Sequence, residues 1–317
     1  MHHLLLVAAL FGQEVHHPTG HLIIVGGGPM VPAISERALA LSGGKKARVL
    51  IVPQASEFID SGRWSEEMWR QAGAQHVAIL DLKDKRKALD AVAKADLIWM
   101  PGGDQGRLMV VLKRQGIIDA IHDRFRHGAT VGGTSAGAAV MSVTMLTSES
   151  KVDRVTIDTA KMPEGLGLWP DVIIDQHFVR RQRCNRLLAA VLNHPENLGI
   201  GIDESTAVVV SGRSFEVIGQ SNVMVIDARN TAKVRSRDGE PEAATNVVMH
   251  LLRSGMRFHL DRGLLTPIDT GLLTQRSAPK APPARPKASP PPETGASHAR
   301  SDAGAQTSGL LRAIQPR

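Results

Sequence analysis

The 317-residue chain is long enough to bury a sizeable core, and 42% of its residues are apolar, which excludes disorder of the whole chain. Aromatic residues make up 3% of the sequence and tyrosine is absent, which argues against a stacking surface for single-stranded nucleic acid. The net charge of +7 is uneven, because residues 276–317 carry +5 and residues 1–275 only +2. The near-neutral body gives no electrostatic sign of a nucleic-acid partner.

The beginning of the chain supports two interpretations. Leu4–Phe11 is a short apolar run, which either the core of an export signal or a frayed start at residues 1–19 explains. The protein is therefore expected to be either exported or cytoplasmic. No apolar stretch reaches the roughly 20 residues that span a bilayer. The single cysteine, Cys184, excludes an intramolecular disulfide and a cysteine-rich zinc site.

Residues 20–275 are predicted to form one domain in which strands and helices alternate. Short apolar runs bounded by glycine or proline indicate strands at 21–25, 48–52, 75–80, 96–100 and 129–132. Helical stretches separate them at 65–72, 86–95, 108–115 and 117–127. This alternation is typical of an α/β fold with a mostly parallel sheet flanked by helices. Such sheets bind ligands beyond the carboxyl ends of their strands, where the glycine-rich loops after Val25, Met100 and Val131 are expected to converge.

The later part of the chain has a different pattern. Residues 206–210, 215–219, 222–227 and 245–252 are predicted to be strands of an antiparallel extension of the sheet. Proline, alanine, serine and basic residues dominate residues 276–317 without periodicity, which predicts a disordered tail.

Ser135 is the candidate nucleophile. It lies in Gly133-Thr134-Ser135-Ala136-Gly137, between the strand predicted at 129–132 and a helix-forming run at 136–145. A strained strand-to-helix turn admits only small residues around such a serine and exposes its hydroxyl. The N–H groups of Ala136 and of Gly103 are the candidate oxyanion donors. The alternative is a tight turn with an ordinary N-cap serine.

A serine nucleophile needs a base and an acid that orients the base. His177 follows the β-branched run at 173–174, and Asp203 and Glu204 follow the apolar run at 200–202. Either carboxylate is suited to orient the imidazole. The alternatives are a surface histidine and a solvated turn, or a lipase-like order in which Asp227 and then His250 or His259 serve Ser135.

Four arginines follow the candidate base within nine residues: Arg180, Arg181, Arg183 and Arg186. Arginine binds carboxylates through two parallel hydrogen bonds, so the cluster suggests recognition of a carboxylate-bearing substrate. The alternative is a solvated helix face.

Four blocks occur in order and together resemble the signature blocks of cyanophycinase and its relatives among the serine peptidases. They are Gly102-Gly103-Asp104-Gln105, Gly133-Thr134-Ser135-Ala136-Gly137-Ala138, Asp175-Gln176-His177-Phe178 and Gly201-Ile202-Asp203-Glu204. The resemblance runs from about residue 20 to residue 252. The tail and the atypical N-terminus lie outside it, and the absence of tyrosine rules out any pocket contact that a tyrosine makes elsewhere in the family.

The resemblance implies a fold similar to the class I glutamine amidotransferases, usually dimeric, and hydrolysis of a β-aspartyl-arginine polymer to dipeptides. It implies Ser135 as nucleophile, His177 as base and Glu204 as the acid of the triad, with no metal or organic cofactor. The residues that it implies for the substrate pocket are Gln105, Asp175, Gln176, Arg181, Arg183 and Arg186.

Three other functions compete with this one. An aspartyl dipeptidase would share the fold, and a non-catalytic binding protein would use the basic tail to recruit a polyanion. A dinucleotide-binding oxidoreductase would use Gly26-Gly27-Gly28, but the phosphate-binding fingerprint requires glycine at its sixth position, where this chain has Val31.

Overall fold

The computed structural model describes residues 20–147, 155–156, 161–234, 240–261 and 265–267. The chain divides into two units, residues 1–273 and 274–317, and every described residue lies in the first. The predicted N-terminal segment 1–19 and the predicted tail 276–317 lie outside the described residues.

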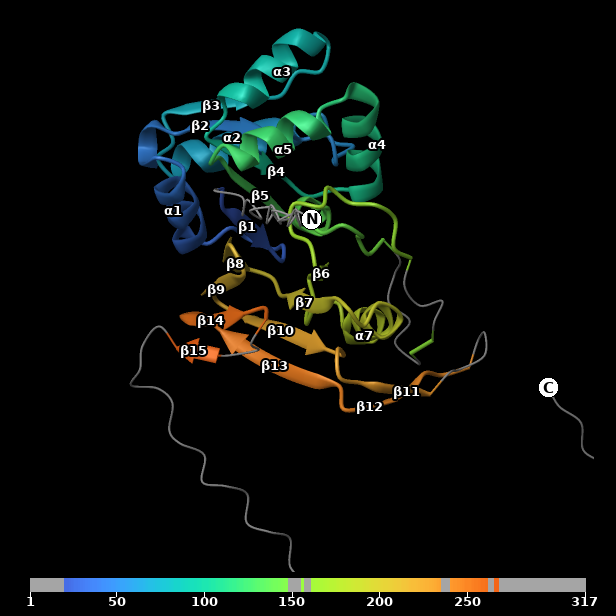
Figure 1. The fold of residues 1–317 in the computed structure, drawn as a ribbon. Helices are drawn as coiled ribbons and strands as arrows, with labels where there is room; N and C mark the ends of the chain where they lie inside the picture. Colours follow the sequence, from blue (N-terminus) through green and yellow to red (C-terminus); the bar gives the residue numbers. More distant parts are fainter. Residues whose placement is uncertain (1–19, 148–154, 157–160, 235–239, 262–264, 268–317) are drawn as a thin grey trace, which may run out of the picture. The chain divides into compact units, whose positions relative to one another are not determined.

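The larger sheet has nine strands in the order β15-β14-β9-β8-β1-β5-β4-β2-β3 (Figure 1). Five neighbouring strands are parallel: β1 (Leu22–Val25), β5 (Thr130–Thr134), β4 (Leu97–Met100), β2 (Arg48–Ile51) and β3 (His76–Ile79). Antiparallel strands extend the sheet beyond β1: β8 (Thr206–Ser211), β9 (Ser214–Gly219), β14 (Met256–His259) and β15 (Leu265–Pro267). The predicted parallel sheet with an antiparallel extension is confirmed, and β8 and β9 are the predicted strands that form the extension. The strands predicted at 222–227 and 245–252 do not extend this sheet, because their backbones pair within other sheets.

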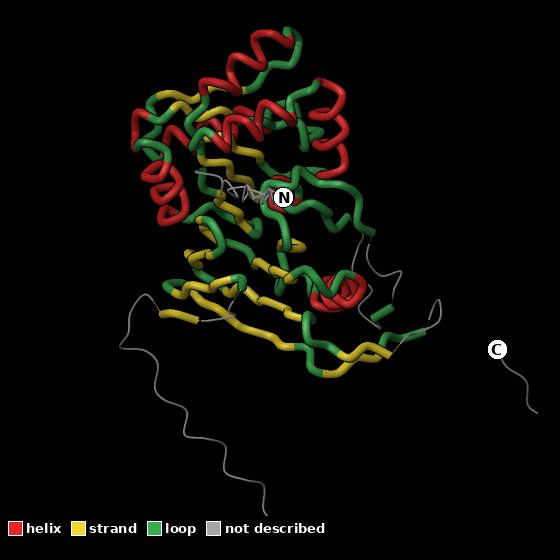
Figure 2. Tube along the Cα trace, in the orientation of Figure 1, coloured by secondary structure: helices red, strands yellow, loops and turns green. Residues whose placement is uncertain are grey.

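Helices cover both faces of the parallel strands (Figure 2). They are α1 (Pro32–Leu41), α2 (Ser61–Gln71), α3 (Lys85–Lys94), α4 (Gln105–Gln115) and α5 (Ile118–Arg126), with a short 3₁₀ turn at Gly44–Lys46. Ile23 and Val25 pack towards α1 and α2, whereas Leu22 and Ile24 pack towards α3, α4 and α5. Because successive strand residues point to opposite faces, a strand covered on both sides is apolar throughout. No helix among the described residues is long and apolar enough to cross a membrane.

A second sheet contains four strands in the order β13-β10-β7-β6. The strands β6 (Val172–Gln176) and β7 (Leu198–Ile202) are parallel, and β10 (Asn222–Asp227) and β13 (Val248–Arg253) are antiparallel to their neighbours. The helix α7 (Cys184–Asn193) packs Leu187 and Val191 against Ile173 and Ile226 of this sheet. The strands β11 (Ala232–Val234) and β12 (Ala243–Thr245) form a separate two-stranded sheet.

Two predicted elements are shorter in the structure than in the prediction. The helix expected at 136–145 is α6 (Ala136–Ala139), because the N–H groups of Leu166 and Trp169 bond to the carbonyls of Val140 and Met141 and draw the chain into an extended pairing. The strand expected at 245–252 is divided into β12 and β13 at Asn246, whose φ of 61° interrupts the extended backbone.

Candidate active site

Ser135 lies at the turn between β5 and α6. Its backbone has φ 54° and ψ −110°, an unfavourable conformation for a residue with a side chain, and such strain concentrates at functional sites. Small neighbours make the turn feasible: a Cβ on Gly133 would lie 2.5 Å from the Gly137 carbonyl oxygen, and a Cβ on Gly137 would overlap the Met100 carbonyl oxygen. The glycines of the pentapeptide are therefore explained by close backbone packing, as the nucleophile-elbow pattern predicts.

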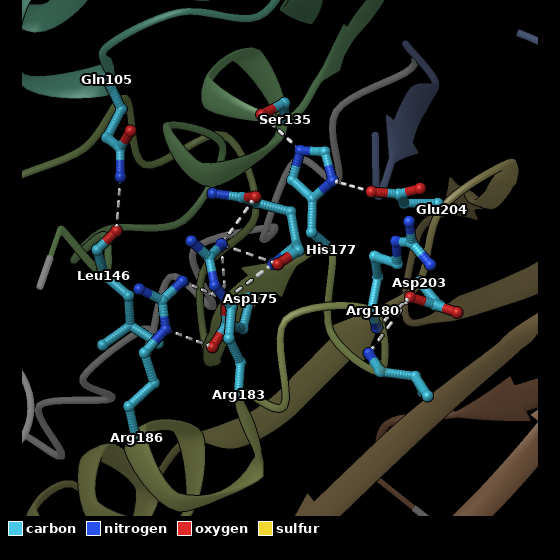
Figure 3. A network of polar contacts seen from close by, with 12 residues as sticks. Gln105, Ser135, Leu146, Asp175, His177, Arg180, Arg183, Arg186, Asp203 and Glu204 are labelled. Carbon is cyan, nitrogen blue, oxygen red and sulfur yellow. Dashed lines mark hydrogen bonds and ion pairs between the residues drawn. The ribbon is translucent and has the colours of Figure 1, made fainter. Parts of the chain in front are cut away.

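His177 follows the last residue of β6, and its imidazole points at Ser135 (Figure 3). The Nε2 atom lies 2.9 Å from Ser135 Oγ. The His177 backbone has φ 49°, and its N–H donates to the Gly26 carbonyl at 2.6 Å. The backbone bond thus connects the end of β6, in the smaller sheet, to the end of β1, in the larger sheet.

Glu204 contacts the imidazole of His177 on the side opposite Ser135, whereas the adjacent Asp203 contacts backbone N–H groups. Glu204 Oε1 lies 2.6 Å from His177 Nδ1. Because a carboxylate only accepts, Nδ1 carries the shared proton, which leaves Nε2 free to accept from the Ser135 hydroxyl. Asp203 instead accepts from the N–H groups of Val179 and Arg180 and so fixes the segment after His177. Of the two carboxylates that the sequence left open, Glu204 is the one at the imidazole.

The glycine-rich loop after β1 forms one wall of the site. A Cβ on Gly27 would lie 2.5 Å from His177 Nε2, and a Cβ on Gly28 would lie 2.8 Å from Glu204 Cβ. Both glycines have positive φ, and the Gly27 carbonyl accepts from the N–H of Ser205 at 2.8 Å. Sequence reasoning expected this loop to converge with the other two but assigned it no side-chain partner. The three consecutive glycines were the available signal.

Burial lowers the pKa of His177 below 6.5, and the hydrogen bond to Glu204 opposes this shift. The positive charges of Arg181 and Arg183 lower the pKa further. The imidazole is therefore neutral at neutral pH, the form in which Nε2 can accept the proton of a hydroxyl.

The loop that contains the predicted oxyanion donor Gly103 lies beside Ser135. A Cβ on Gly102 would lie 3.4 Å from Ser135 Cβ, and Gly103 itself contacts Ala55 so closely that a Cβ would overlap the Ala55 carbonyl oxygen. The other predicted donor, Ala136, is the first residue of α6. Their roles as donors stay predictions.

Asp175, Arg183 and Arg186 lie below the imidazole and form a buried network with Gln176 (Figure 3). Arg186 donates from Nε and Nη2 to the two oxygens of Asp175, with Nε–Oδ2 at 2.7 Å. Arg183 donates to the carbonyl and the side-chain oxygen of Gln176, at 2.8 Å each. Burial raises the pKa of Asp175, and the two guanidinium groups oppose this shift.

This network corrects two expectations. Arg183 and Arg186 are almost fully enclosed, so the alternative of a solvated helix face is wrong for them. Asp175, which the resemblance implies for the substrate pocket, is completely buried and already holds the guanidinium of Arg186. A buried charge is tolerated when it is paired and hydrogen-bonded, which is the arrangement here.

The two remaining predicted pocket residues make other contacts. Gln105, the first residue of α4, donates from Nε2 to the Leu146 carbonyl at 2.7 Å. Arg181 is exposed, and its backbone N–H donates to the His177 carbonyl at 2.9 Å. Whether these side chains bind substrate stays a prediction.

The lipase-like alternative does not assemble around Ser135. Asp227 pairs with Arg229 at 2.7 Å, and the ring of His250 packs against Phe258 with centroids 5.1 Å apart. His259 lies next to Asp261 at the far strand β14. Within the described residues, no group of three or more histidine, cysteine or acidic side chains is arranged to hold a metal ion.

Comparison with known proteins gives one family. The family model described as "Peptidase family S51" matches residues 22–218. Over 238 residues the chain is 37% identical to a cyanophycinase of Nostoc sp., covering 71% of this chain and 80% of that protein. It is 38% identical over 239 residues to a cyanophycinase of Geminocystis herdmanii, covering 71% of this chain and 87% of the other.

More distant similarities agree with the fold. A peptidase E of Pasteurella multocida is 23% identical over 185 residues, which cover 56% of this chain and 77% of that protein. The crystal structure of a peptidase from an acI-B1 Actinobacterium superposes with a TM-score of 0.57 at 24% identity, covering 77% of this chain and 98% of that chain. At that identity the superposition supports the fold alone.

Proposed function

The chain belongs to peptidase family S51 and is a serine-type peptidase, and from this premise we propose that it hydrolyses the β-aspartyl-arginine polymer cyanophycin to β-Asp-Arg dipeptides. The observation that carries the proposal is the hydrogen-bonded series from Ser135 through His177 to Glu204. The cyanophycinase of Nostoc sp. matches 71% of the chain at 37% identity, whereas the peptidase E of Pasteurella multocida matches 56% at 23% identity, which favours the polymer as substrate.

In the proposed reaction His177 Nε2 takes the hydroxyl proton as Ser135 Oγ attacks the carbonyl carbon of the amide that joins one β-Asp-Arg unit to the next. The β-amide within each unit stays intact. Glu204 holds the Nδ1 proton and stabilises the imidazolium that forms. The imidazolium then protonates the leaving amine, and an acyl-enzyme ester remains on Ser135. Water, deprotonated by the same imidazole, hydrolyses this ester and regenerates the serine.

The backbone N–H groups of Ala136 and Gly103 are the proposed donors to the tetrahedral oxyanion. Ala136 opens α6, where the helix dipole also favours negative charge. Removing one such donor typically costs about 10²–10³ in kcat. Backbone donors cannot be deleted by side-chain substitution, so the serine itself is the better position to test.

A β-linked aspartyl substrate presents free α-carboxylates, which arginine binds well. We assign Gln105 and Arg181 to the polar lining of the substrate pocket, and Gln176 and Arg183 to the enclosed layer behind it. Asp175 and Arg186 support it, because their buried pair fixes the end of β6 and the first turn of α7, which positions Arg183. The homodimer usual for the family is also expected, and light scattering on the purified protein measures it.

The test is incubation of the purified protein with cyanophycin and identification of the soluble products by mass spectrometry. Release of β-Asp-Arg by the wild type, and none by Ser135→Ala, supports the proposal. Turnover of Asp-X dipeptides with no attack on the polymer would instead favour the aspartyl dipeptidase. A fluorophosphonate probe provides a second readout, since labelling should require Ser135 and a neutral His177.

A further inference from the structure

A cavity of about 700 Å³ lies next to the candidate nucleophile, and Gly103, the proposed oxyanion donor, is among the residues that line it. Gly28, Gly102 and Thr134 line the side of the cavity that faces the site. Thr134 precedes Ser135 in the chain, Gly102 packs on Ser135, and Gly28 packs on Glu204. A ligand bound at Ser135 therefore has direct access to the cavity.

Two aromatic side chains form the outer part of this cavity. Phe58 and Trp64 line it, with ring centroids 6.1 Å apart, and they are 69% and 60% exposed. The other three tryptophans of the sequence, Trp69, Trp99 and Trp169, are all buried. Two exposed aromatic rings together at a cavity mouth mark a binding surface more often than an ordinary surface patch.

The charged side chains that line the cavity are acidic, and Arg107 pairs with one of them. Among its described lining residues, the charged side chains are Glu57 and Asp104, both acidic. Glu57 is exposed and pairs with Arg107, and Asp104 accepts from the N–H of Arg107 at 2.6 Å. An aromatic face together with carboxylates is the environment that a guanidinium group prefers, because the ring faces attract the cation and the carboxylates accept its N–H groups.

The segment that carries the rings is tied to the loop beside Ser135. The Ala55 carbonyl accepts from the N–H of Asp104 at 2.8 Å and closely approaches Gly103. The N–H of Phe58 donates to Ser56 Oγ at 3.1 Å. The aromatic pair therefore has a defined position relative to the nucleophile, as specific binding requires.

We propose that this cavity is a subsite for the guanidinium of an arginine on a repeat unit next to the unit being cleaved, with Phe58 and Trp64 stacking on it and Glu57 and Asp104 supplying negative charge. The inference rests on the proposed function, because only a polymer with one arginine per repeat offers such a neighbouring side chain. Such a subsite makes the enzyme selective for the polymer over the isolated dipeptide.

The first experiment pairs a substrate change with a protein change. The substrates are a (β-Asp-Arg)₃ oligomer and analogues in which one arginine at a time is replaced by citrulline, its neutral isostere. Citrulline at one neighbouring position should raise the wild-type KM roughly 3- to 30-fold, the range of a cation–π contact. We call this ratio of KM values the citrulline penalty. In Trp64→Ala this citrulline penalty should fall to near one, whereas Trp64→Phe should keep most of it.

Val110→Ala is the matched control, because Val110 is an exposed apolar residue of α4 outside the cavity lining, and its citrulline penalty should equal that of the wild type. An equal penalty in the wild type and Trp64→Ala would overturn the inference. Failure of the wild type to cleave the oligomer at all would instead overturn the proposed function, so the two failures are distinguishable.

Tryptophan fluorescence gives a readout without turnover. In Ser135→Ala, the added (β-Asp-Arg)₃ oligomer should protect the exposed Trp64 from acrylamide quenching, whereas the three buried tryptophans contribute little to quenching in either state. The protection should disappear in Ser135→Ala with Trp64→Phe. Unchanged quenching on oligomer binding, with binding verified by calorimetry, would overturn the inference.

Discussion

At the scale of single residues, two adjacent carboxylates have separate roles. Glu204 reaches His177 Nδ1, while Asp203 accepts from two backbone N–H groups and from the Ser221 hydroxyl at 2.8 Å. The carboxylates differ because they follow β7 in succession, so that their side chains diverge. Glu204 therefore lies where the proposed triad needs its acid, and Asp203 holds the segment that follows His177.

This division predicts opposite results from two matched substitutions. Glu204→Gln should lower kcat by about 10²–10⁴, because an amide no longer selects the required tautomer or stabilises the imidazolium. Asp203→Asn should change kcat by less than about tenfold and reduce the free energy of unfolding by about 1–3 kcal/mol, because charged acceptor bonds are lost. Steady-state kinetics and urea unfolding of both variants measure the contrast. The assignment is wrong if Asp203→Asn has the larger kinetic effect.

The pKa of His177 gives a second prediction at this scale. The base must be neutral, so kcat/KM falls as the pH drops through the pKa of the imidazole in the free enzyme. Because burial, Arg181 and Arg183 all lower that pKa, the acid limb of the wild type should lie below pH 6.5. Arg181→Gln removes one of the positive charges, so the pKa should rise and the acid limb should move to higher pH.

A pH profile of kcat/KM for the wild type, Arg181→Gln and Arg180→Gln tests this expectation. Arg180 is the neighbouring exposed arginine, and its substitution should shift the limb less. An effect of Arg181 on substrate binding alone would lower kcat/KM at every pH without moving the limb. An unmoved limb in Arg181→Gln therefore contradicts the electrostatic role.

At the scale of elements, the loop between β1 and α1 is the most sensitive part of the site. Gly27→Ala places a methyl group against the His177 ring, and a misplacement of about 1 Å costs about 10²-fold in rate. Gly43→Ala is the matched control, since Gly43 has a similar φ of 101° but nothing within 4 Å of an added Cβ. Both variants should lose about 1–3 kcal/mol of stability from backbone strain.

Only Gly27→Ala should lose activity by about 10²-fold or more. Kinetics and thermal unfolding of the two variants separate the effects. Similar activity in both variants would mean that the loop does not position the imidazole.

The buried strands were predictable from the sequence, whereas the length of α6 was not. Runs such as Leu22–Val25 and Leu97–Met100 were predictable because burial on both faces requires uninterrupted apolar residues. The early end of α6 was not predictable, because the pairing with residues 163–169 that replaces the helix is a tertiary interaction. Local propensity is a weak determinant where such pairing competes.

The burial of Arg186 was missed for the same reason. On its own helix Arg186 points away from the main apolar stripe, which favours an exposed position. Its partner Asp175 lies on β6, eleven residues earlier, and only the packing of α7 on the smaller sheet brings the two together. Ser135, His177 and Glu204 were predictable because each lies within two residues of the end of a strand.

At the scale of the whole domain, the candidate site joins two sheets. Ser135 follows β5 of the larger sheet, His177 follows β6 of the smaller sheet, and Glu204 lies on the connection from β7 to β8, where the chain passes between them. Bonds from the N–H groups of His177 and Ser205 to the Gly26 and Gly27 carbonyls fix the junction. The geometry of the site therefore depends on packing across the domain.

The positive charge of the chain is concentrated in its tail, away from the proposed site in the sequence. Residues 276–317 carry +5 of the net +7, whereas all of the proposed catalytic, pocket and subsite residues lie between Gly28 and Glu204 and the family match ends at residue 218. Deleting residues 276–317 should therefore leave kcat/KM on the soluble (β-Asp-Arg)₃ oligomer within about twofold, while retention on a cation exchanger decreases because the remaining charge is +2. A full-length variant with the seven basic residues of the tail changed to glutamine separates charge from length. Suppose that the deletion variant hydrolyses the oligomer much more slowly, whereas the glutamine variant hydrolyses it at the wild-type rate. This result would show that the tail contributes to the peptidase itself and that the domain does not end at residue 275.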